Sequence, residues 1–88
     1  MVSKLVVERT GVTGAGALTA DARAILDAYI ADGRITHTES NMVDEVEHVS
    51  IFFQGASTLD AYIAEIQALG NFRDPGVTVL NIQRFDDI

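Results

Sequence analysis

The sequence contains no cysteine, no tryptophan and only one proline. Without cysteine, the chain can form neither disulfides nor thiolate-ligated zinc sites. No uninterrupted apolar run approaches the roughly 20 residues that a membrane-spanning helix requires. The amino-terminal stretch MVSKLVVERT is too short and too charged for a secretory signal peptide. We therefore expect a cytoplasmic protein with no membrane partner.

Basic residues are also scarce. Six Lys and Arg residues stand against 13 Asp and Glu residues, which gives a formal net charge of −7 at pH 7. No two of the basic residues are adjacent, whereas nucleic-acid binding needs a clustered basic surface for phosphate contacts. The charge balance argues against a nucleic-acid partner. It indicates either a well-solvated surface or an acidic patch that could meet a basic partner.

The 88 residues are 48% hydrophobic and 22% charged, a composition typical of one folded domain. Alternating β-branched and aromatic residues predict strands, and apolar residues at helical spacing predict two helices. Thr19 and Ser57 are the expected N-caps of these helices. The predicted order is a strand at 2–9, a helix at 20–32, strands at 34–40 and 45–54 joined by a turn at 41–44, a helix at 58–69 and a strand at 77–85.

This order is that of the split βαβ, or ferredoxin-like, arrangement. It predicts a single α+β domain over residues 1–88, in which two helices cover one face of a four-stranded antiparallel sheet. Right-handed crossovers give the spatial strand order 4-1-3-2. The helix residues expected in the core are Ile25, Leu26, Ile30, Ile63, Ile66 and Leu69.

The sheet face without helices should carry an apolar patch, because apolar residues occupy both faces of several predicted strands. An uncovered patch of this kind marks an interface. We therefore expect a homo-dimer or homo-trimer whose interface includes Val2, Val6, Phe52, Val77 and Val79.

A glycine-rich loop separates the first strand from the first helix, where an anion-binding loop would lie. Its spacing is neither the dinucleotide fingerprint nor a P-loop, so a simple connector is the better-supported interpretation and an anion-binding loop is the alternative. The candidate ligand-binding residues of this loop are Gly11, Thr13, Gly14, Gly16 and Thr19.

The predicted hairpin at 34–54 concentrates ionisable side chains. If the turn lies at Met42-Val43, His37 faces His48 and Glu39 lies nearby, so the three could bind a metal ion or act in acid–base chemistry. If Val43 is at the tip, His37 faces Val49 instead. In that case the histidines could be ordinary surface residues or respond to pH.

Nucleophilic catalysis has little support, because there is no cysteine and no motif surrounds any serine. Tyr62 lies on a predicted helix stripe, where it could be a core residue with its hydroxyl at the rim or a catalytic acid. The candidate catalytic residues are therefore His37, Glu39, His48 and Tyr62. No cofactor is indicated.

Three functions remain open, the last of which is a structural interaction protein without a ligand. The first is a small acidic, oligomeric binding module that binds a protein or a small ligand, a format shared with phage or mobile-element inhibitors of host components. The second is a small oligomeric enzyme with sites between subunits. The order of elements is broadly similar to that of trimeric ferredoxin-like enzymes such as phage-type S-adenosylmethionine lyases, and this likeness of architecture implies such an activity.

Overall fold

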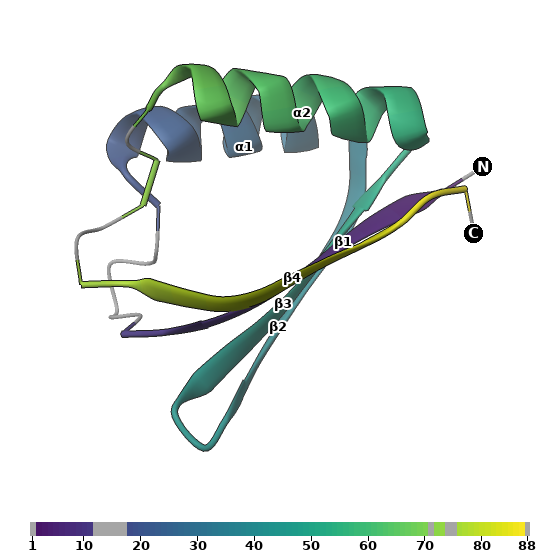
Figure 1. Ribbon diagram of the computed structural model, residues 1–88. Coiled ribbons are helices and arrows are strands. Elements are labelled where there is room, and N and C mark those ends of the chain that lie inside the picture. Colours follow the sequence, from purple (N-terminus) through teal and green to yellow (C-terminus); the bar gives the residue numbers. More distant parts are fainter. Residues whose placement is uncertain (1, 12–17, 71, 74–75, 88) are drawn as a thin grey trace.

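Figure 1 shows the computed structural model, which describes residues 2–11, 18–70, 72–73 and 76–87. The predicted order of strands and helices is confirmed. The elements are β1 (Ser3–Thr10), α1 (Ala20–Ala31), β2 (Ile35–Val43), β3 (Val46–Phe53), α2 (Ala56–Ala68) and β4 (Thr78–Phe85).

The four strands form one antiparallel sheet in the order β2-β3-β1-β4, which is the predicted order. Both helices lie on the same side of this sheet (Figure 1). The α+β prediction is therefore confirmed. Neither α1 nor α2, with 12 and 13 residues, is long and apolar enough to cross a membrane.

The core lies where the helices approach the sheet. Strand alternation turns Leu5, Val49, Ile51 and Phe53 toward the helices, and all four are buried. The helices contribute two tyrosines, and the Tyr62 ring lies 5.2 Å from the rings of both Tyr29 and Phe53. The remaining buried hydrophobic residues of this cluster are Ala22, Ile35, Leu59 and Ile66.

The prediction for the helix faces was partly wrong. Ile66 is buried, but Ile25, Leu26 and Ile63 are only partly buried, and Ile30 and Leu69 are exposed. The sheet diverges from the helix layer toward the β2–β3 hairpin, as Figure 1 shows. Strand twist of this kind leaves part of each helix without a facing strand.

One of the two helix N-caps is the residue predicted from the sequence, and the other is not. The Thr19 side chain accepts a hydrogen bond from the Ala22 amide at 3.4 Å, as predicted for an N-cap. The predicted cap at Ser57 was wrong, because α2 already begins at Ala56. There the Asp87 carboxylate, from the carboxy-terminal end of the described chain, accepts a hydrogen bond from the Ala56 amide at 3.3 Å.

Both predicted hairpin registers were wrong. The turn consists of Asp44 and Glu45, and β2 extends to Val43, which pairs with Val46. A bulge between Ile35 and His37 then brings Ile35 opposite Phe53, so that both side chains are buried on the helix side. A bulge compensates for a register that would otherwise turn the start of the strand to the wrong face.

Candidate functional site

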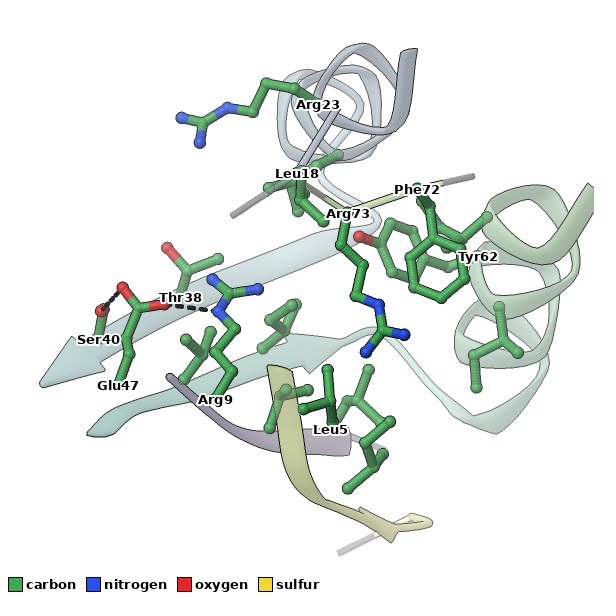
Figure 2. Close-up of a pocket in the computed structure, with 18 of the residues that line it drawn as sticks. Leu5, Arg9, Leu18, Arg23, Thr38, Ser40, Glu47, Tyr62, Phe72 and Arg73 are labelled. Atoms are coloured by element: carbon green, nitrogen blue, oxygen red, sulfur yellow. Dashed lines mark hydrogen bonds and ion pairs between the residues drawn. The ribbon is translucent and has the colours of Figure 1, made fainter. Parts of the chain in front are cut away.

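A cavity of about 680 Å³ lies between the helix layer and the sheet (Figure 2). Its walls are mostly apolar and come from both layers. The helices and the segments next to them contribute Leu18, Leu26, Ile30, Tyr62, Ile63, Ile66 and Phe72, and the strands and the residue before β4 contribute Leu5, Val7, Val49, Ile51, Val77, Val79 and Ile82.

The cavity explains the partial burial of the helix stripe. Leu26, Ile30 and Ile63, which were expected to pack against strands, line this space instead. Each therefore lies on the helix side that faces the sheet without being covered by it. The apolar pattern of the sequence thus forms a core and an adjoining cavity, and Leu5, Tyr62 and Ile66 belong to both.

An ion pair forms one polar edge of the cavity. Arg9 and Glu47 are directly opposite each other on β1 and β3, and their side chains meet at 2.6 Å between Nε and Oε1. The Ser40 hydroxyl donates a hydrogen bond to the other Glu47 oxygen at 3.0 Å. Figure 2 shows this chain of contacts from β1 through β3 to β2. Both charges are largely withdrawn from solvent, with side-chain exposures of 18% and 16%.

Tyr62 extends from α2 into the cavity (Figure 2). Its residue surface is only 5% exposed. Burial raises the pKa of the Tyr62 hydroxyl to about 12, although the positive charge of Arg9 acts in the opposite direction. A phenol with this pKa stays protonated near neutral pH and donates a hydrogen bond.

Two further arginines line the opening. Arg23 belongs to α1 and pairs with Asp27 one turn later, at 3.3 Å. Arg73 precedes β4, and its side chain extends across the cavity in the direction of Leu5 (Figure 2). The Arg73 backbone is held by an antiparallel bridge to Leu18, and the Thr19 amide donates to the Phe72 carbonyl at 3.2 Å.

The glycine-rich loop can be placed only at its ends. Gly11 has a φ of +78°, and a side chain there would overlap the Gly76 carbonyl. Thr19 serves as the helix cap, so its hydroxyl already has a structural role. The other candidates, Thr13, Gly14 and Gly16, lie outside the described residues.

The structure does not bring the two histidines together. His37 faces Phe52, and His48 faces Asn41, about 13 Å away along β3. Each histidine has its own carboxylate at 3.1 Å, which is Glu39 for His37 and Glu8 for His48. Among the described residues, no three His, Asp or Glu side chains are placed to hold a metal ion. The register that motivated the His37–Glu39–His48 site is thus absent.

The sheet face without helices carries both apolar and charged side chains. Val6 and Phe52 lie on it, and the Lys4 ammonium lies 5.4 Å from the Phe52 ring centre and 5.9 Å from that of Phe85. Val2 immediately precedes β1. Val77 and Val79, in contrast, line the cavity on the helix side, because a bulge in the β1–β4 pairing shifts the alternation of β4. The other residues of this face include Glu8, His37, Glu39, His48 and Gln83.

Sequence reasoning missed Arg9, Glu47 and Arg73 as site residues. The alternation of β1 and β3 places Arg9 and Glu47 on the helix side, so two charges on otherwise apolar strand faces were the available signal. Arg73 lies outside every helix and strand. Its position depends on the bridge to Leu18, which no local pattern encodes.

Comparison of the chain with known protein families, curated proteins and solved structures found no match. A function for this protein is therefore inferred from the geometry of the cavity.

Proposed function

We propose that the protein is a small-ligand-binding module with a ferredoxin-like fold, and that its ligand occupies the cavity between the helices and the sheet. The observation that carries this proposal is a space of about 680 Å³ enclosed by apolar side chains of both layers. Small-molecule sites usually measure about 300–1,000 Å³ and combine apolar walls with a few polar groups.

The free energy of burying apolar surface favours a ligand in the cavity. Apolar surface left in contact with water forgoes roughly 25 cal/mol per Å² relative to buried surface. Leu26, Ile63 and Val79 line the cavity and are only partly buried. A closer approach of the helices to the sheet would bury them. A ligand with an apolar body would complete the packing, and its binding would stabilise the folded state.

A small molecule fits this space better than a second copy of the chain does. The walls belong to two layers of the same domain, so the space is concave. The enzyme alternative receives less support, because His37 and His48 are far apart on the opposite sheet face and Tyr62 is a weak acid.

The experiment is a titration with N-phenyl-1-naphthylamine, a neutral apolar dye whose fluorescence rises in apolar sites. We expect saturable binding of one dye per chain. Val79→Trp should weaken it strongly, since Val79 lines the space and a larger side chain there would occupy part of the cavity. Leu80→Trp is the matched control, because Leu80 is the next residue on β4 and is 56% exposed to solvent.

Failure of the wild-type protein to bind the dye, or equal binding by both variants, would contradict the proposal. Loss of self-association in Val79→Trp without any dye binding by the wild type would show that a second copy occupies the cavity.

A further inference from the structure

The charges around the cavity differ from those of the whole protein. Three of the six basic residues line it, namely Arg9, Arg23 and Arg73, against only two of the 13 acidic residues, Glu39 and Glu47, and Glu39 belongs by strand alternation to the face without helices. The lining thus carries three positive and two negative charges, or +1, in a protein of net charge −7. Half of the positive charge of an acidic protein is collected at one site.

Most of these charges already have partners. Arg9 pairs with Glu47 at 2.6 Å, Arg23 with Asp27 at 3.3 Å, and Glu39 with His37 at 3.1 Å. Within the described part of the chain, the Arg73 guanidinium has no ion pair and only a contact with the Phe72 ring, whose centre is 5.8 Å away. Among the described residues that line the cavity, Arg73 is therefore the cation without an ion-pair partner, and its guanidinium can meet an anionic ligand.

Tyr62 supplies a second donor. The residue is only 5% exposed and lines the cavity, and its hydroxyl makes no hydrogen bond in the described part of the chain. Figure 2 shows Tyr62 and the Arg73 side chain entering the same space from α2 and from the segment before β4.

We propose that the cavity selects apolar monocarboxylates, whose carboxylate is bound by Arg73 and Tyr62 while the hydrocarbon body packs between α2 and the sheet. This inference rests on the proposed function and names its ligand class. A carboxylate accepts hydrogen bonds only, and its two oxygens match a guanidinium on one side and a phenol on the other. One unpaired guanidinium balances one negative charge, which favours a monocarboxylate over a phosphate or a dicarboxylate.

The test compares decanoate with decan-1-ol, which share the same ten-carbon chain and differ at the head group. Dissociation constants come from NMR titrations of the ¹⁵N-labelled full chain at pH 7.5. We expect the wild type to prefer decanoate by about five- to tenfold, the range of one partly exposed charged contact plus one hydrogen bond.

Arg73→Gln should remove most of this preference by weakening decanoate binding about fivefold, with decan-1-ol unaffected. Tyr62→Phe should weaken decanoate severalfold while keeping the ring contacts. Arg23→Gln is the matched control, because Arg23 lines the same opening but is paired with Asp27, and it should behave as the wild type does.

The two proposals fail in different ways. If neither compound binds, the proposed function itself is wrong. If decan-1-ol binds as well as decanoate, or if Arg73→Gln keeps the full preference for decanoate, the cavity is a ligand site but the carboxylate assignment is overturned.

Discussion

Tyr62 combines two roles in one side chain. Its ring contributes to the core through an edge contact with Tyr29 and a tilted contact with Phe53, and its hydroxyl faces the cavity. The neighbouring Tyr29 is buried as well, but its hydroxyl donates to the Glu65 carboxylate. Burial and this hydrogen bond raise the pKa of Tyr29. The two tyrosines thus differ in whether their hydroxyl has a hydrogen-bond partner among the residues that the structure describes.

The raised pKa of Tyr62 predicts a loss of stability in alkali. Below pH 10 the phenol is protonated in both the folded and the unfolded state, so its contribution is fully present. Between pH 10 and about 12 only the unfolded state releases the proton, and the free energy of unfolding should fall by about 2–3 kcal/mol. Urea denaturation at pH 9 and pH 11.5 measures this difference, and Tyr62→Phe should remove much of it. An unchanged pH dependence in that variant would show that Tyr62 titrates normally.

Truncation at two apolar positions of α2 should have unequal effects, because one position is in the core and the other faces the cavity. Leu59 is fully buried, so Leu59→Ala should reduce the free energy of unfolding by about 3 kcal/mol through the transfer and cavity terms. Ile63→Ala should lose only about 1 kcal/mol, because the removed atoms border existing space. Thermal denaturation of both variants tests this ranking. Equal losses would indicate that Ile63 is packed in a closed core.

At the scale of single elements, the β2–β3 turn is the least favourable piece of backbone described. Asp44 and Glu45 have φ values of +50° and +67°, as two-residue hairpin turns require. Asp tolerates this conformation, but Glu does not favour it. The turn is retained because it lets β2 and β3 pair along their length.

A sequence suited to this turn should stabilise the hairpin. Replacement of Asp44-Glu45 by Asn-Gly should raise the free energy of unfolding by about 1 kcal/mol, because Gly adopts a positive φ without steric cost. Chemical denaturation measures the gain. Gly33→Ala is the reciprocal control, because Gly33 has a φ of +76° and no close neighbour. This variant should lose about the same free energy of unfolding, through backbone strain alone. A destabilised Asn-Gly variant would mean that the turn lies elsewhere.

For the whole molecule, the two edges of the sheet differ in how well they would accept another chain. β4 exposes Leu80, Ile82 and Phe85, and its only charged residue is Arg84. β2 exposes Met42 and Val43 but carries Glu39 and a run of polar residues. Long apolar edges without lysine or proline invite strand pairing.

We therefore expect the chain to form a dimer or trimer, with β4 as the contact edge. The net charge of −7 opposes association, but salt screens charges beyond about 8–10 Å, so association should tighten as salt rises. Sedimentation equilibrium at micromolar concentrations tests this. Ile82→Lys should give a monomer, whereas Met42→Lys at the other edge should not. A 9.5 kDa species at every salt concentration would contradict the expectation.

The opposite sheet face gives an independent readout of the same assembly. Phe52 lies on that face, between Lys4 and His37, rather than in the core. Phe52→Asp should therefore fold, as circular dichroism would show. If it also dissociates the oligomer while Ile82→Lys does not, the contact is made by the open face instead of the β4 edge.

The short-range pattern of the sequence was sufficient to predict the order of the strands and helices. The apolar alternation of residues 49, 51 and 53, the helical spacing of apolar residues and the Thr19 cap all depend on neighbours within one turn or one strand. Because the crossover of βαβ units has a fixed hand, this local information also predicted the strand order. Tyr62 could be selected on the same basis, from its place on the helix stripe.

The features that make the site depend on contacts between distant residues. The hairpin register depends on a bulge that lets Ile35 join Phe53 in the core, and the cap of α2 comes from Asp87, 31 positions later. The cavity exists because the sheet twists away from helices whose apolar faces are continuous in sequence. Arg73 reaches that cavity only through its bridge to Leu18. Periodicity records which side of an element is apolar, but the separation between layers follows from the twist and packing of the assembled chain.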